Sequence, residues 1–226
     1  MIYLDFQDTP VKACWTGASE GDLSGLPVGS QRSEMLRWLI GDRSLLRVLQ
    51  VHGSVVVTEE AVGGQPLRVP SGDAIVATGA GRCLVILTAD CMPVALASSE
   101  GIYGAVHAGW RGLMAGVLEN AVGAIRRYGA SKVYAAVGPS IGPCCYEFSQ
   151  EGAMAVAARF GMDVMATSHR GAISLDLARG AATALERVGA IVTWQANECT
   201  ACSGKYFSYR SGDLSSRQAM CVWRED

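Results

Sequence analysis

The chain has 226 residues, a net charge of −2 and 50% hydrophobic residues, but no uninterrupted apolar stretch long enough to cross a membrane. It has no basic block, and the segment that starts at Met1 has neither the basic nor the apolar part of a secretory signal. These features argue against binding to membranes or nucleic acid and favour a cytoplasmic protein whose eight cysteines are reduced thiols. No linker or repeat divides the sequence, so residues 1–226 are expected to form a single domain.

The first half of the chain is predicted to consist mainly of strands, because short runs of Val, Ile and Leu alternate with Gly, Pro and Ser. A Gly- and Ser-rich loop spans residues 16–29, and Ser33 is a suitable N-cap for a helix that ends near Ile40. The predicted strands cover residues 11–15, 46–51, 54–58, 73–77, 84–87, 94–97 and 102–106.

The second half alternates between helices and strands. Residues 113–128 form the clearest predicted helix, because apolar residues recur at helical spacing while Glu119, Arg126 and Arg127 occupy the other side. Two further helices are expected at residues 149–160 and 175–188, strands at 133–137 and 191–194, and two more strands separated by turns between 199 and 223. This alternation predicts an α/β fold.

Three reactive side chains lie near the ends of predicted strands. His52 and His107 each follow an apolar run and precede a small residue, and Cys91 occupies the turn between two apolar runs. Open α/β sheets place their ligands at such strand ends, so these three residues could meet in one cleft. The third histidine, His169, lies in a polar segment and is interpreted as an ordinary loop residue.

Two imidazoles and one thiolate form a suitable three-ligand set for Zn²⁺, with a fourth position left open for chemistry. The three residues are far apart in the sequence, so their spacing alone does not establish that they converge. A histidine at a strand end is also often a hydrogen-bonded structural residue. Both interpretations remain open at this point.

The segment after His107 adds a candidate anion site. Gly109 and Gly112 flank Arg111 at the predicted start of the strongest helix, where free backbone N–H groups and a guanidinium favour phosphate or carboxylate. The alternative is a tight turn between strand and helix in which Arg111 has only a structural role.

The other cysteines are assigned separately. Cys14, Cys83 and Cys221 lie in or beside apolar runs and are expected in the core, whereas adjacent Cys144 and Cys145 lie in a Gly/Pro turn. The pair Cys199 and Cys202 has the spacing of half a zinc site or of a redox pair. No second pair with this spacing exists, so we interpret it as incidental.

Five sequence blocks occur in order along the chain: QVHG at 50–53, TADCMPV at 88–94, VHAGWRG at 106–112, GPSIGPCCYE at 138–147 and FSYR at 207–210. Together they resemble the laccase-domain, or polyphenol oxidase, family. Members are regarded mainly as purine nucleoside phosphorylases and are related to putative cysteine hydrolases. The resemblance implies a layered α-β-β-α fold with mixed sheets.

The same resemblance implies a set of functional residues. His52, Cys91 and His107 correspond to a metal site, usually occupied by zinc with copper as the alternative ion, and together with Arg111 they are the expected catalytic residues. The expected substrate-binding residues are Gln50, Cys145, Tyr146 and Arg210.

The implied reaction is phosphorolysis of adenosine, inosine or methylthioadenosine to the free base and ribose 1-phosphate, with adenosine deamination as a compatible side activity. The expected partners are a purine nucleoside and phosphate, and the expected state is a monomer or homodimer. The N-terminal quarter departs from the family pattern, because a basic residue usual there is missing around Cys14 and Gly21. Arg32, Arg111 and Arg210 are the arginines that could take over its role.

Two other functions remain open. In a metal-independent cysteine hydrolase or amidase, Cys91 would be the nucleophile and His107 its base. A catalytically weak binding protein is the other alternative, because of the N-terminal departures. Multicopper phenol oxidation is disfavoured, since the chain has only three histidines.

Overall fold

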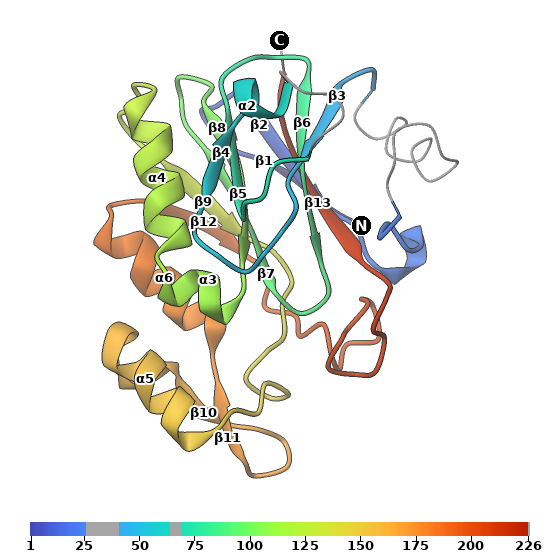
Figure 1. The fold of residues 1–226 in the computed structure, drawn as a ribbon, viewed down its shortest axis with the longest axis vertical. Helices are drawn as coiled ribbons and strands as arrows, with labels where there is room; N and C mark the ends of the chain where they lie inside the picture. Colours follow the sequence, from blue (N-terminus) through green and yellow to red (C-terminus); the bar gives the residue numbers. More distant parts are fainter. Residues whose placement is uncertain (26–40, 64–68, 226) are drawn as a thin grey trace.

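The computed structural model describes residues 1–25, 41–63 and 69–225. Two mixed sheets pack face to face, and helices cover the outer face of the larger one (Figure 1). The predicted α/β fold with mixed sheets is therefore confirmed. The helix predicted from Ser33 to Ile40 and the candidate Arg32 lie outside the described residues.

The smaller sheet has the strand order β1-β2-β13-β6-β3. All of its neighbouring strands are antiparallel except β3 and β6, which run parallel. The sheet therefore joins the N-terminal hairpin to the last strand of the chain. Its strands are β1 (Ile2–Asp5), β2 (Val11–Trp15), β3 (Ser44–Arg47), β6 (Arg82–Thr88) and β13 (Gln218–Arg224).

The larger sheet has the order β12-β9-β7-β8-β5-β4, with antiparallel strands at its centre and a parallel pair at each edge. Every residue of β7 and β8 is buried, because both faces of these central strands are covered. The strands are β4 (Val56–Thr58), β5 (Ala74–Ala77), β7 (Met92–Ala97), β8 (Tyr103–Ala108), β9 (Tyr134–Val137) and β12 (Ile191–Gln195).

Alternation along β5 shows how the layers are held together. Ile75 and Ala77 belong to the core between the two sheets, whereas Ala74 and Val76 belong to the core beneath the helices. Successive side chains of a strand point to opposite faces, so a strand covered on both sides must be apolar throughout. This explains why the sequence shows continuous apolar runs rather than an alternating pattern.

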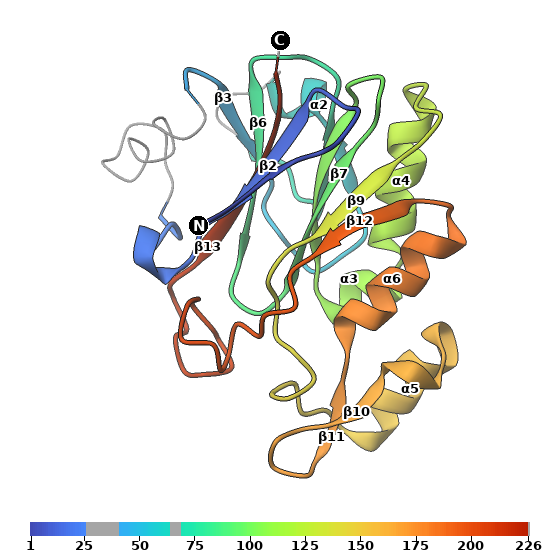
Figure 2. The same ribbon diagram turned by 180° about the vertical axis from the view of Figure 1, so that it is seen from behind.

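The helices α3 to α6 gather on one side of the molecule, as both views of the ribbon show (Figures 1 and 2). Helix α4 packs on β5 and β8, and α6 packs on β12, while α5 lies beside the short hairpin formed by β10 (Met165–Thr167) and β11 (Ile173–Leu175). None of the helices in the described part of the chain has the length and apolarity of a membrane-spanning helix. The helices are α2 (Glu59–Gly63), α3 (Trp110–Met114), α4 (Val117–Arg127), α5 (Gln150–Phe160) and α6 (Leu177–Arg187), with 3-10 turns η1 (Ala18–Glu20) and η2 (Met162–Val164).

The structure corrects several predicted boundaries. The helix predicted over residues 113–128 is two helices, because Gly116 adopts a left-handed conformation (φ 85°) between α3 and α4. The third predicted helix starts later than residue 175, since Ile173–Leu175 forms β11 against β10 (Met165–Thr167) and Asp176 caps α6. Sequence analysis missed this hairpin and β1.

The C-terminal prediction was also wrong in part. Of the two strands expected between residues 199 and 223, only β13 forms, and residues 200–217 consist of turns and bends. In this segment the side chains of Ser208 and Asp213 accept hydrogen bonds from nearby backbone N–H groups and so compete with a strand ladder.

Gly116→Ala is expected to destabilise the fold by about 1 kcal/mol, because an L-residue is strained in the left-handed region. A Cβ at this position would meet no atom closer than 3.6 Å, so the effect isolates backbone strain. Gly123→Ala, inside α4, is the matched control and is expected to stabilise by roughly 0.5–1 kcal/mol. Urea unfolding of both variants measures the difference, and equal effects would contradict this account.

Candidate metal and active site

Three segments bring His52, Cys91 and His107 together. His52 lies in the connection from β3 to β4, Cys91 in the turn between β6 and β7, and His107 on β8. One ligand atom from each lies within 4.8 Å of the other two, and the two imidazole rings meet edge to face with centroids 4.8 Å apart. His107 is buried, Cys91 is partly buried and His52 is exposed, so the group opens to the surface on the His52 side.

The buried carboxylate of Asp73 positions both histidines. Its Oδ1 accepts hydrogen bonds from His107 Nδ1 at 2.8 Å and from the backbone N–H of His52 at 2.9 Å. Its Oδ2 accepts from the N–H of Gly53 at 2.6 Å and of Val51 at 3.3 Å. His52 has a left-handed backbone (φ 59°), and these bonds hold it there.

Asp73 was not recognised in the sequence as a functional residue. It directly precedes β5, and a fully buried Asp at the start of an apolar strand is rare unless it is paired. An acidic residue directly before an apolar strand was therefore the sequence feature that could have identified Asp73 as a functional residue. Because Asp73 engages His107 Nδ1, the ring's Nε2 is left for Cys91 or for an ion.

These contacts shift the pKa values of Cys91 and His107 in opposite directions. Burial raises the pKa of Cys91, but hydrogen bonds and charges from His107 and His52 outweigh it and lower the pKa to about 6. Burial lowers the pKa of His107, but Asp73 and Cys91 outweigh it and raise the pKa to about 9. Both shifts favour the charged forms, a Cys91 thiolate beside a His107 imidazolium.

The turn that presents Cys91 is fixed by its neighbour Asp90, which has a positive φ of 89°. The Asp90 carboxylate accepts hydrogen bonds from Thr200 Oγ1 at 2.6 Å and from the Arg210 backbone N–H at 2.7 Å. Its backbone carbonyl accepts from the N–H of Ile141. Three distant parts of the chain are thereby joined beside Cys91, and sequence analysis identified neither Asp90 nor Thr200 as part of this arrangement.

Gly109 leaves room for the group. A Cβ at this position would lie 3.0 Å from Cys91 Sγ and 3.1 Å from His52 Cδ2. Any side chain at residue 109 would therefore displace two of the candidate ligands. This close approach gives a physical reason for glycine two residues after His107.

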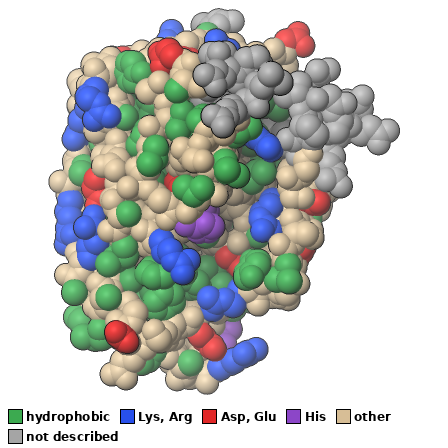
Figure 3. Space-filling view, in the orientation of Figure 1, with side chains coloured by type: hydrophobic (Ala, Val, Ile, Leu, Met, Phe, Trp, Pro, Cys, Tyr) green, Lys and Arg blue, Asp and Glu red, His purple; other side chains and the backbone are tan. Residues whose placement is uncertain are grey.

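Tyr146 and two arginines lie beside the group. The Arg210 guanidinium lies 4.9 Å from the centre of the Tyr146 ring and donates to the Glu147 carbonyl at 3.1 Å. Burial, followed by the charge of nearby Cys91, raises the pKa of Tyr146 to about 12, while Arg210 and Arg111 oppose this rise. Figure 3 shows an exposed histidine with Lys and Arg side chains around it on one face.

Other predicted site residues are placed differently. Both ends of the Gln50 amide bond to the backbone of Leu87, so the observed contacts of Gln50 hold its loop against β6. Cys145 belongs to a separate group of cysteines. Arg111 stacks on Trp110 in α3, which has only five residues, so the expected anion site does not lie at the start of the long helix α4. The only feature that still supports the predicted anion site is the positive charge of the Arg111 guanidinium.

The donor set of His52, Cys91 and His107 fits a zinc-type ion. A thiolate and two imidazoles are preferred ligands, and Asp73 supplies the carboxylate partner that commonly orients a metal-bound histidine. The fold and this group together define a layered α/β protein with a candidate metal-dependent active site.

The chain belongs to the family described as Multi-copper polyphenol oxidoreductase laccase, which it matches over residues 8–225. It is 39% identical over 178 residues to a protein of Streptomyces coelicolor named purine nucleoside phosphorylase, covering 77% of this chain and 72% of that one. It is 35% identical over 211 residues to a protein of the same name from Streptomyces griseus, covering 92% and 85%.

A solved structure confirms the fold. The crystal structure of a Neisseria meningitidis protein is similar to this chain with a TM-score of 0.83 and 26% identity, covering 100% of this chain and 99% of that one. The layered architecture implied by the sequence blocks is thus shared along the whole chain.

Asp73→Asn is expected to destabilise the metal-free protein by about 3 kcal/mol, because it leaves a buried imidazolium and several N–H donors poorly paired. It should also raise the pKa of Cys91 from about 6 toward its ordinary range. Site-resolved alkylation of Cys91 as a function of pH measures this change.

Glu59→Gln is the matched control, because Glu59 also accepts three hydrogen bonds, from Thr78 and Gly79, beyond the other end of β5. It should lower stability without moving the alkylation profile. An unchanged Cys91 profile in Asp73→Asn would contradict the role given to Asp73.

Proposed function

We propose that this protein catalyses the metal-dependent phosphorolysis of purine nucleosides such as adenosine, inosine or methylthioadenosine to the free base and ribose 1-phosphate. The observation that carries the proposal is the His52–Cys91–His107 group, opening beside an aromatic ring and two arginines. The names of the relatives support the same reaction class.

The side chains around the group suit the two substrates. Arg111 and Arg210 carry the positive charge that would hold a phosphate dianion near the anomeric carbon. Tyr146 offers an aromatic face to a base or ribose, and because its pKa is raised to about 12, its hydroxyl stays protonated and can donate a hydrogen bond.

The expected ion is zinc, with copper as the alternative. Bound to His52, Cys91 and His107, it would act as a Lewis acid toward substrate oxygen. The chain's own residues fix the ligands: Asp73 orients His107 and holds the loop of His52, and Asp90 holds the turn of Cys91.

The three histidines in the chain are too few for a multicopper cluster, which disfavours phenol oxidation. Adenosine deamination is proposed as a side activity of the same site.

One observation favours a second candidate, a metal-independent cysteine hydrolase. Cys91, His107 and Asp73 form a chain of thiolate, imidazolium and carboxylate, with 2.8 Å between His107 Nδ1 and Asp73 Oδ1. This is the arrangement of an activated nucleophile with its base and orienting group. Metal dependence separates the two candidates.

His52→Ala, Cys91→Ala and His107→Ala are each expected to lose one bound zinc per chain and to lower phosphate-dependent release of base at least about 100-fold, because each removes a candidate ligand. Elemental analysis and inosine and adenosine phosphorolysis are measured on the same samples. His169→Ala, at the exposed third histidine, is the control and should retain both zinc and activity.

The hydrolase candidate predicts a different result. Metal-free protein would retain turnover, and that turnover would depend on Cys91 and His107 but not on His52. Activity in every variant, or none in the wild type with phosphate and nucleoside present, would reject the phosphorylase.

Arg210→Gln is expected to raise the KM for phosphate or nucleoside about tenfold, since a charged hydrogen-bonding group contributes roughly 1.5–3 kcal/mol. Arg210→Lys should recover only part of this loss, because lysine keeps the charge but not the flat stacking on Tyr146. Arg170→Gln, on an exposed turn, is the control. If all three variants have the same kinetics as the wild type, the proposed role of Arg210 in substrate binding is wrong.

A further inference from the structure

Four cysteines outside the candidate active site form a second compact group. The sulfurs of Cys144, Cys145, Cys199 and Cys202 all lie within 4.8 Å of one another. Cys144 Sγ and Cys202 Sγ are 3.7 Å apart although 58 residues separate them in the sequence. All four are free thiols, and the structure places them on two loops rather than in the apolar core.

These distances suit a tetrahedral ion. Four thiolates around zinc, each about 2.3 Å from the ion, would be separated by about 3.8 Å along each tetrahedral edge. A disulfide would instead require about 2.05 Å between two sulfurs. The distance of 3.7 Å between Cys144 Sγ and Cys202 Sγ is close to the length of such an edge.

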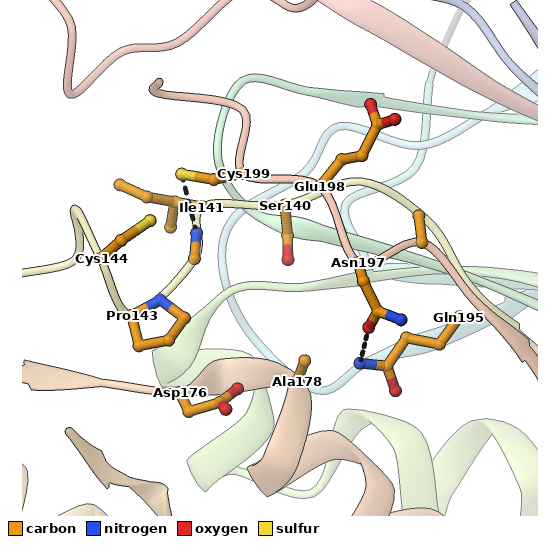
Figure 4. Close-up of a pocket in the computed structure, with 12 residues that line it drawn as sticks. Ser140, Ile141, Pro143, Cys144, Asp176, Ala178, Gln195, Asn197, Glu198 and Cys199 are labelled. Atoms are coloured by element: carbon orange, nitrogen blue, oxygen red, sulfur yellow. Dashed lines mark hydrogen bonds between the residues drawn. The ribbon is translucent and has the colours of Figure 1, made fainter. Parts of the chain in front are cut away.

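The backbone at Gly142 contacts the cysteine group in two ways. The N–H of Gly142 donates to Cys199 Sγ at 3.2 Å, a bond that favours a thiolate and that Figure 4 shows as the dashed line at Cys199. A Cβ at Gly142 would lie 3.2 Å from Cys144 Sγ and 3.2 Å from Cys199 Cβ. The absence of a side chain there permits the two loops to approach.

An ion would have a route to the group from solvent. Cys144 and Cys199 line one end of an adjoining pocket of about 220 Å³, whose other walls include Asp176 and Asn197 (Figure 4). Cys202 is exposed. A metal site requires such an entry path in addition to suitable ligands.

We propose that Cys144, Cys145, Cys199 and Cys202 form a structural tetrathiolate zinc site, separate from the candidate active site. Sequence analysis treated Cys199 and Cys202 as incidental because no second pair with the same spacing exists. The structure supplies the missing half from the adjacent residues Cys144 and Cys145.

The site would join the two irregular loops that support the candidate active site. The loop of Cys144 and Cys145 continues into Tyr146, and Thr200, between the other two cysteines, donates to Asp90 beside Cys91. Residues 200–217 have no regular secondary structure, so a cross-link at their start would restrict a long segment. Four protein ligands leave no open position, which assigns the ion to structure rather than chemistry.

Zinc counting tests the proposal. Protein purified under reducing conditions and equilibrated with zinc is expected to hold two ions per chain. The double variant Cys199→Ser/Cys202→Ser should hold one and keep the ion of the candidate active site. Cys91→Ser is the control, because it removes a thiol from the candidate active site and should lose only the ion held there.

The two proposals fail independently. Two ions in the Cys199→Ser/Cys202→Ser variant, or a disulfide among the four residues in the reduced protein, would overturn the tetrathiolate site. Loss of zinc only in Cys91→Ser would overturn it as well. A wild type with one ion that is lost only in the double variant would support this site and reject the metal-dependent active site.

Cobalt substitution keeps the test decisive if the double variant does not fold. Thiolate-to-cobalt absorption should be lower in Cys202→Ser than in the wild type. In His52→Ala, where only the cobalt held by the single thiolate of Cys91 is lost, most of this absorption should remain. Alkylation of Cys144 and Cys199 should slow at least about tenfold when zinc is added, because bound thiolates are protected. Equal alkylation rates with and without zinc would reject the site.

Discussion

The carboxylate of Asp73 is the contact on which the candidate active site depends. It accepts hydrogen bonds from the His107 ring and from three successive backbone N–H groups around His52. A buried charge without partners would be costly, so the loop and the ring are both drawn to it. One side chain therefore fixes the strained backbone of one histidine and the ring orientation of the other. Because Asp73 begins β5, the two-sheet core holds the carboxylate in place.

A second carboxylate, that of Asp90, acts in the same way beside Cys91. Asp90 joins the Cys91 turn to Thr200 and to the backbone of Arg210. The apolar core positions β5, β7 and β8, but it does not specify how their connecting loops meet. Two buried carboxylates fix the loops by hydrogen bonds: Asp73 positions the two histidines, and Asp90 positions the turn of Cys91. The arrangement relates the fold to the site: the sheets supply rigid strand ends, and charged hydrogen bonds orient the loops between them.

Much of the fold followed from patterns that act over a few residues. The continuous apolar runs predicted the strands around Cys91 and His107, and the helix predicted at residues 149–160 matches α5 with its N-cap. The break at Gly116 was missed because the apolar spacing continues through it, and only backbone conformation distinguishes a helical glycine from a left-handed one. The partners of Asp73 and the approach of Cys144 to Cys202 depend on tertiary contacts, which local spacing does not encode. The three candidate ligands were named from their places at strand ends, whereas the residues that orient them were not.

The two sulfur-containing groups differ in the feature that separates chemistry from structure. His52, Cys91 and His107 offer three donors and an exposed side, whereas the four cysteines offer four donors, enough to fill every position of a tetrahedral ion. Yet the groups are not independent, because Thr200 lies between two of the four cysteines and donates to the residue before Cys91. The loop that would be restrained by one ion therefore supports the turn that presents a ligand to the other. An ion bound by the four cysteines would place a cross-link beside the candidate active site, and it would help a long segment without regular structure to hold Arg210 next to Tyr146.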